Sequence, residues 1–110
     1  MQERKLTAVN ILDIKDFRSK DIEQFHTILK SRNIEIEQIV SFGKTTPKGE
    51  WYDQDWDEWV LVMQGTAELT FDAGRVITMK QGDYLLLEKN IRHRVSSASE
   101  DCIWLAVHIK

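Results

Sequence analysis

The chain has 110 residues, of which 42% are hydrophobic and 30% are charged, and its formal net charge is −3. This composition predicts one globular domain over residues 1–110 and argues against global disorder. Because the basic residues are scattered rather than clustered, neither a nucleic acid nor an anionic membrane is expected as a partner.

The only cysteine, Cys102, has no second cysteine with which to form an internal disulfide, and this favours a reducing compartment. The first residues lead into no apolar core of a secretory signal. No apolar run approaches the roughly 20 residues that a membrane-spanning helix needs. The sequence therefore predicts a cytoplasmic protein.

Residues 1–33 are predicted to form an arm and one helix. The apolar residues that recur with the 3.6-residue period of an amphipathic helix are Ile22, Phe25, Ile28 and Leu29. Ser19 is the predicted N-cap of this three-turn helix. The helix is expected to lie outside the sheets, and the apolar residues 10–14 are expected to form a short strand or an extended arm.

Residues 34–110 change to a period of two, which is typical of strands. The first strand has Ile34 and Ile36 on one face and Glu35 and Glu37 on the other. Strands are predicted over residues 34–40, 58–63, 66–71, 75–79, 84–87, 91–97 and 102–109. Short strands separated by glycine turns favour a sandwich or barrel, and the lack of strand–helix–strand alternation argues against a parallel α/β sheet.

Two ionisable residues, Glu58 and His93, are predicted to point into the interior. Glu58 shares a strand face with Val60 and Val62, where a carboxylate must be paired, hydrogen-bonded or bound to a metal. His93 lies between two arginines that prefer water, so its own side chain should point inward. A neutral imidazole is a common metal ligand and a common general base.

Residues 43–109 resemble the cupin family. The family's first motif, G-x5-H-x-H-x3/4-E-x6-G, keeps its last interval between Glu58 and Gly65. Its second motif, G-x5-P-x-G-x2-H-x3-N, keeps its frame between Gly82 and His93. The resemblance implies a mainly β fold, a cupin-type jelly-roll (double-stranded β-helix) barrel over residues 34–110, with the predicted N-terminal helix packed outside.

The two histidines of the first motif are missing. Their positions hold Tyr52 and Gln54, or Trp51 and Asp53 with the longer spacing, and the sequence is similar to a subgroup of short bacterial cupins with this Trp-Tyr-Asp-Gln stretch. In the second motif the proline, the glycine and the final asparagine are replaced. The replacing residues are Glu88, Asn90 and Ser97.

In related cupins the H-x-H pair, the glutamate and the second-motif histidine hold a divalent metal. The resemblance implies a metal site of Gln54, Glu58 and His93, with Tyr52 and Gln54 lining the pocket. A bend in the chain would instead turn Asp53 or Asp55 inward as an alternative ligand, giving a carboxylate–carboxylate–histidine set. A structural hydrogen bond between Glu58 and Tyr52 or His93 is an equal alternative to metal ligation.

Two further features leave alternatives open. His108 faces either the cavity or the outside, because both faces of the last predicted strand are plausible interior faces. Trp59, Leu61 and Met63 form an apolar outward face, which suggests a second buried layer such as the partner subunit of a homodimer.

Three functions are consistent with these residues, and the sequence leaves open whether the protein is an enzyme. The favoured one is a cupin-type barrel that binds a small-molecule ligand, with or without an atypical site for a divalent metal ion as its only cofactor. The second is a metal-dependent dioxygenase or isomerase, which needs three good ligands and an open coordination position. The third is a metal-free enzyme in which Glu58 and His93 act as an acid–base pair.

Overall fold

The computed structural model describes residues 6–14 and 21–110. These residues form eight strands and no helix. Accordingly, no described segment is a helix with the length and apolar character needed to cross a membrane. The strands are β1 (Gln24–Lys30), β2 (Ile34–Val40), β3 (Asp57–Gln64), β4 (Thr66–Phe71), β5 (Val76–Lys80), β6 (Tyr84–Leu87), β7 (His93–Ala98) and β8 (Ile103–Ile109).

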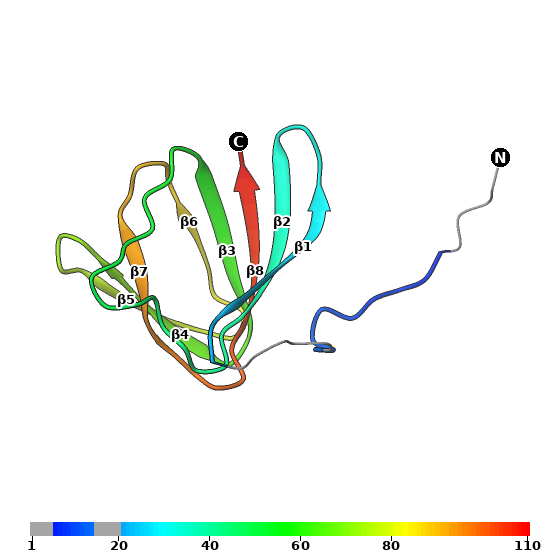
Figure 1. Ribbon diagram of the computed structural model, residues 1–110, viewed down its shortest axis with the longest axis horizontal. Helices are drawn as coiled ribbons and strands as arrows, with labels where there is room; N and C mark the ends of the chain where they lie inside the picture. The colour runs from blue at the N-terminus through cyan, green and yellow to red at the C-terminus, as the bar shows by residue number, and fades with distance from the viewer. Residues whose placement is uncertain (1–5, 15–20) are drawn as a thin grey trace.

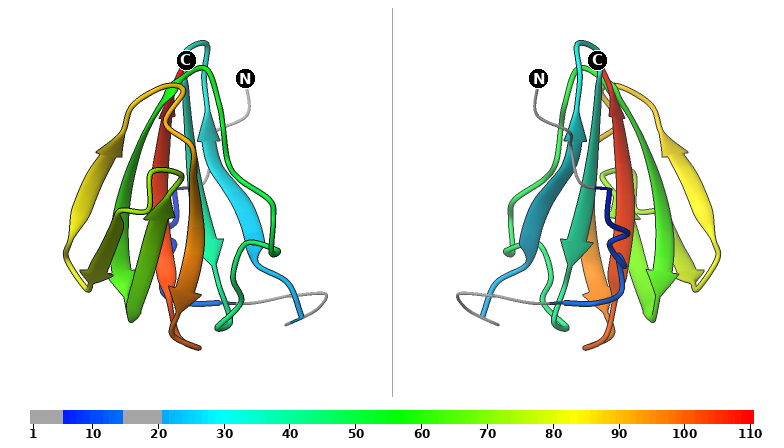
Figure 2. Two further views of the ribbon diagram at one scale, coloured as in Figure 1. Left: turned by 90° about the vertical axis from the view of Figure 1, so that its left-hand side faces the viewer. Right: turned by 90° about the vertical axis from the view of Figure 1, so that its right-hand side faces the viewer.

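The strands form two antiparallel sheets that face each other (Figures 1 and 2). The larger sheet has the order β1-β2-β8-β3-β6, and the smaller has the order β5-β4-β7. From β3 onward the chain crosses between the sheets four times, at β3–β4, β5–β6, β6–β7 and β7–β8. The mainly β prediction is therefore confirmed, and all seven predicted strands are present with ends shifted by at most two residues.

The core lies between the sheets and consists of the residues that alternate inward. On β3 the buried positions are Glu58, Val60 and Val62, as the period of two predicts. β8 sets Trp104 and Ala106 opposite Val62 and Val60 in the neighbouring strand. Burying these apolar side chains supplies the main driving force for packing the two sheets.

The predicted helix over residues 21–29 is wrong, because this segment forms β1 and pairs with β2. Its apolar residues do not form one buried stripe, since Ile22 is 63% exposed and Ile28 is 54% exposed. An irregularity in the register between Thr27 and Leu29 shifts the inward and outward alternation, which explains why the spacing imitated a helical period. Short helices are marginal on their own, and pairing with β2 outweighs the local preference.

Two predictions for the N-terminal part have other outcomes. Residues 10–14 form no strand but belong to an arm, in which Asn10 Oδ1 accepts a hydrogen bond of 2.8 Å from the Leu12 backbone. Gln38 donates a side-chain hydrogen bond to the Ile11 carbonyl and ties this arm to β2. The proposed N-cap Ser19 lies outside the described residues.

Residues 46–52 run beside β7 and bring Tyr52 next to His93. The Thr46 backbone N–H donates to the Val95 carbonyl at 3.0 Å, and the Thr46 hydroxyl accepts from the Val95 N–H at 2.9 Å. Further along, Tyr52 and His93 exchange two backbone hydrogen bonds of 2.7 and 3.1 Å. This pairing covers the edge of β7 and orders a segment that has little regular structure of its own.

The outer face of the larger sheet carries the apolar residues that suggested a partner subunit. Trp59, Leu61 and Met63 are each half-buried, and Trp59 packs against the ring of Tyr84 at a centroid distance of 5.5 Å. Tyr84 is 68% exposed and Leu86 is 47% exposed on the same face. The homodimer remains a prediction.

Gly65 links β3 to β4 in a position where a side chain does not fit. Its φ is +79°, and a Cβ would lie 2.3 Å from Ser99 Oγ and 2.9 Å from Cys102 Cα. Gly65→Ala combines left-handed strain with overpacking, so we expect it to lower the free energy of unfolding by about 2–4 kcal/mol. Urea denaturation of the purified variant measures this loss.

Gly74→Ala is the matched control. Gly74 also has a positive φ, of +91°, but a Cβ there would meet nothing within 4 Å. It should therefore lose only about 1 kcal/mol, from backbone strain alone. Equal losses in the two variants would show that the close packing around Gly65 contributes nothing.

Candidate functional site: a pocket between the sheets

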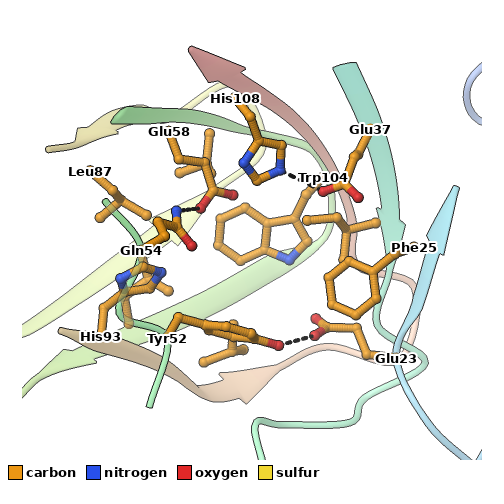
Figure 3. A pocket seen from close by; sticks show the side chains of 14 residues that line it. Glu23, Phe25, Glu37, Tyr52, Gln54, Glu58, Leu87, His93, Trp104 and His108 are labelled. Carbon is orange, nitrogen blue, oxygen red and sulfur yellow. Dashed lines mark hydrogen bonds and ion pairs between the residues drawn. The ribbon is translucent and has the colours of Figure 1, made fainter. Parts of the chain in front are cut away.

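A pocket with a volume of about 100 Å³ lies between the two sheets (Figure 3). One water needs only roughly 10–15 Å³ of such space, so the pocket has room for a small molecule. Its apolar lining is Phe25, Ile39, Val60, Leu69, Leu87, Val95 and Trp104. Its polar lining is Glu23, Glu37, Tyr52, Gln54, Glu58, His93 and His108.

The structure brings together all four residues that the sequence proposed for the site. Tyr52, Gln54, Glu58 and His93 line the same pocket. Glu58 is only 7% exposed and His93 only 4%, so both predicted inward orientations are confirmed. They come from different sheets, β3 and β7, and meet because the sheets face each other.

Gln54 holds the buried carboxylate of Glu58. Gln54 Nε2 donates a hydrogen bond of 2.6 Å to Glu58 Oε1 (Figure 3). The Gln54 backbone is fixed in turn, because its carbonyl accepts from the Asn90 N–H at 2.8 Å. The sequence predicted Tyr52 or His93 as the hydrogen-bond partner of Glu58, but in the structure the partner is Gln54.

The backbone fixes the tautomer of His93. His93 Nδ1 lies 3.1 Å from the Ile91 carbonyl oxygen, which can only accept, so Nδ1 carries the proton in the neutral ring. The ring also contacts Tyr52, at a centroid distance of 5.6 Å, and Phe71, at 6.4 Å. Nε2 is then the nitrogen with the free lone pair that could accept a proton or a hydrogen bond.

The side chains present do not fit a divalent metal well. Among residues 6–14 and 21–110, no group of three or more His, Cys, Asp or Glu side chains converges as metal ligands would. The third proposed ligand, Gln54, directs its amide N–H rather than its carbonyl oxygen at Glu58. A cation shared by these two side chains would have to replace that hydrogen bond.

The alternative ligands Asp53 and Asp55 do not line the pocket. Both are exposed, and Asp53 Oδ2 lies 3.9 Å from Arg92 Nε at the surface. The chain therefore does not bend in the way that would give a carboxylate–carboxylate–histidine set.

Glu23 is a pocket residue that the sequence did not indicate. Its carboxylate accepts hydrogen bonds from Ser41 Oγ at 3.0 Å and from Tyr52 Oη at 3.5 Å. The pKa of Glu23 is raised to about 7: burial is the main cause, the two hydroxyl donors oppose it, and the nearby charge of Glu58 adds a smaller upward shift. Burial and the charge of Glu23 also raise the pKa of Tyr52 to about 12.

His108 faces the pocket, which decides between the two orientations that the sequence left open. Trp56 Nε1 donates to His108 Nδ1 at 2.9 Å, and His108 Nε2 lies 2.6 Å from Glu37 Oε1. The hydrogen bond to Glu37 raises the pKa of His108, and burial opposes this shift. Protonating Nδ1 would also break the bond from Trp56, because an indole N–H can only donate.

The two acidic pocket residues that the sequence did not indicate, Glu23 and Glu37, come from segments whose place in the sheets the sequence does not reveal. Glu37 belongs to the β2 face opposite Ile34 and Ile36, and that polar face points into the pocket. Glu23 precedes β1, where the predicted helix hid any strand pattern. Alternation separates the two faces of a strand but does not say which face meets the other sheet.

The comparisons with known proteins agree with this architecture. A family model described as the cupin domain matches residues 38–108. The chain belongs to the cupin family. The second cupin motif has a glycine at the position of Asn90, and Asn90 here has a φ of +67°, a conformation that asparagine tolerates better than most residues.

Several solved structures are similar over nearly the whole chain. A Ralstonia eutropha JMP134 protein, provisionally named a mannose-6-phosphate isomerase, is 32% identical with a TM-score of 0.85, covering 96% of this chain and 99% of that chain. An RmlC-like cupin from Desulfovibrio desulfuricans is 19% identical, with a TM-score of 0.76 and coverages of 96% and 97%. A cupin superfamily protein from Desulfitobacterium hafniense DCB-2 is 17% identical, with a TM-score of 0.75 and coverages of 96% and 93%. No curated protein matches the sequence.

The raised pKa of Glu23 makes stability depend on pH. The folded protein holds this proton up to about pH 7, whereas the usual carboxyl value is 4.5, so stability falls as pH rises through this window. Glu23→Gln mimics the protonated form at every pH. We expect the free energy of unfolding of Glu23→Gln, relative to that of wild type, to increase by about 3 kcal/mol between pH 4.5 and pH 8.

Urea unfolding of wild type and Glu23→Gln at both pH values measures this difference. Glu50→Gln, at an exposed site, is the control and should show no such change. A stability difference between Glu23→Gln and wild type that is the same at both pH values would mean that Glu23 is not held protonated in the folded protein.

Proposed function

We propose that this cupin binds a small organic molecule directly in the pocket between its sheets, without a metal ion in between. The observation that carries the proposal is the Gln54–Glu58 hydrogen bond. Gln54 occupies the position of a metal-binding histidine of the cupin motif. Its side-chain N–H donates to Glu58 Oε1, so this oxygen is not available to coordinate a cation.

The character of the pocket supports small-molecule binding. Ligand sites are commonly concave and apolar, with a few converging polar groups that set orientation. Here apolar residues from both sheets form the walls, and the polar side chains approach from five different parts of the chain. The divalent metal remains a prediction from the family resemblance, which the donor groups present do not favour.

Metal-free acid–base catalysis is the second candidate, and one observation favours it. Glu23 has a pKa of about 7 and lines the same pocket as the predicted pair, Glu58 and His93. A catalytic acid or base works best when its pKa lies near the working pH. The Ralstonia eutropha protein is provisionally named an isomerase, and proton transfer within one substrate is a reaction of that class.

Metal analysis tests the main proposal. Protein purified without added metal should contain far less than one equivalent of any transition metal, and a chelator should leave its thermal midpoint unchanged. Inductively coupled plasma mass spectrometry and thermal unfolding measure these two quantities. One equivalent of metal retained in wild type and lost in His93→Ala would overturn the proposal.

Restoring one histidine should create the site that the wild type lacks. Gln54→His removes the N–H directed at Glu58 and adds an imidazole beside Glu58 and His93, completing three good ligands. We expect this variant to bind Co²⁺ about 10-fold or more tightly than wild type, as measured by isothermal titration calorimetry. Gln64→His, outside the pocket lining, is the control. Unchanged affinity in Gln54→His would show that Gln54 does not decide metal binding.

A further inference from the structure

The indole nitrogen of Trp104 is a buried donor without an acceptor. Trp104 lies on β8 and is only 3% exposed, and its Nε1 has no hydrogen-bond partner in the described part of the chain. Its ring lines the pocket, and in Figure 3 the nitrogen lies on the side of the ring toward Glu23 and Tyr52. Buried N–H groups are nearly always paired, so an unpaired one in a pocket points to an acceptor on the ligand.

The remaining polar groups of the pocket are mostly acceptors. Glu23, Glu37 and Glu58 are its three carboxylates, and no lysine or arginine is among its lining residues in the described ranges. Each carboxylate has two oxygens with about four acceptor positions, so accepting one or two hydrogen bonds leaves further capacity. A ligand must therefore supply hydrogen-bond donors to the carboxylates and an acceptor to Trp104.

This combination excludes ligands that carry only one kind of polar group. A phosphate or carboxylate offers Trp104 an acceptor, but the pocket lining has three glutamates and no lysine or arginine, and the imidazole of His108 is already hydrogen-bonded to Glu37. An ammonium group suits the carboxylates but has no lone pair for the indole N–H. An uncharged alcohol satisfies both requirements, because its oxygen accepts while its O–H donates.

We propose that the pocket takes an uncharged polyhydroxy compound, with one hydroxyl oxygen accepting from Trp104 Nε1 and its O–H groups donating to the carboxylates. This inference rests on the proposed function and adds the chemical class of the ligand. Phe25 and Tyr52 offer the carbon-bearing faces of such a molecule apolar ring surfaces. The provisional name of the Ralstonia eutropha protein refers to a phosphorylated sugar. Such a ligand does not meet these requirements, because its phosphate would lie among carboxylates with no lysine or arginine in the pocket lining.

The indole N–H signal of Trp104 reports on this contact directly. The chain has four tryptophans, so a ¹H–¹⁵N spectrum shows four indole signals, and Trp104→Phe identifies the one that belongs to Trp104. The probes are glycerol, D-mannose, mannose 6-phosphate and methylammonium, which differ in charge and size; methylammonium carries a donor group and no acceptor. We expect the Trp104 signal to move to lower field with D-mannose or glycerol and to move much less with the two charged compounds.

Affinity measurements with variants test whether the indole N–H causes binding. Trp104→Phe keeps an aromatic ring and removes the donor, so the neutral probe should bind about 10-fold more weakly. Trp59→Phe, on the outer face of the same sheet, should bind as wild type does. If Trp104→Phe does not fold, Trp51→Phe, Trp56→Phe and Trp59→Phe assign the Trp104 signal by elimination, and the wild-type titration still tests the contact.

The outcomes separate this inference from the function on which it rests. Binding of mannose 6-phosphate or methylammonium as strong as that of mannose would overturn the uncharged polyhydroxy class and leave a small-molecule pocket in place. Mannose binding that leaves the Trp104 signal unmoved would overturn the role of the indole. If neither glycerol, mannose nor the two charged compounds bind, both the ligand class and the proposed direct binding fail.

Discussion

The burial of the Glu58 carboxylate is the constraint that organises this pocket. A carboxylate between apolar neighbours is stable only when other groups replace its lost hydration. Gln54 provides an N–H at 2.6 Å, and Asn90 holds the Gln54 backbone, so the loop between β6 and β7 supports a side chain on β3. The same interaction places an amide where many cupins have a histidine, and this changes which ligands the site can accept.

The sequence was sufficient for seven of the eight described strands and for the position of the site, but not for the full set of residues that line it. Alternation placed Glu58 and His93 inward, and the structure confirms both because each lies on a strand with one buried face. The helical reading of β1 was wrong because the register irregularity after Thr27 disturbs that alternation. The sequence did not show that β1 pairs with β2, or which face of β2 meets the other sheet. Glu23 and Glu37 could therefore not be assigned to the pocket.

The two histidines of the pocket have different chemical capacities because of their partners. Both nitrogens of His108 are engaged, one by the Trp56 donor and one by Glu37, so this ring links β2 to the segment before β3. His93 uses one nitrogen on a backbone carbonyl and keeps a lone pair on the other. Of the two, therefore, only His93 can act on a ligand without first losing a structural hydrogen bond.

Three carboxylates line this small cavity, and burial, with a smaller contribution from the charge of Glu58, raises the pKa of one of them, Glu23. Glu58 accepts a hydrogen bond from the amide N–H of Gln54, and Glu37 is hydrogen-bonded to the imidazole of His108. The donors to Glu23 are the hydroxyls of Ser41 and Tyr52. A hydroxyl can turn and accept instead, so Glu23 stays hydrogen-bonded in both protonation states and can change charge with little rearrangement of its surroundings.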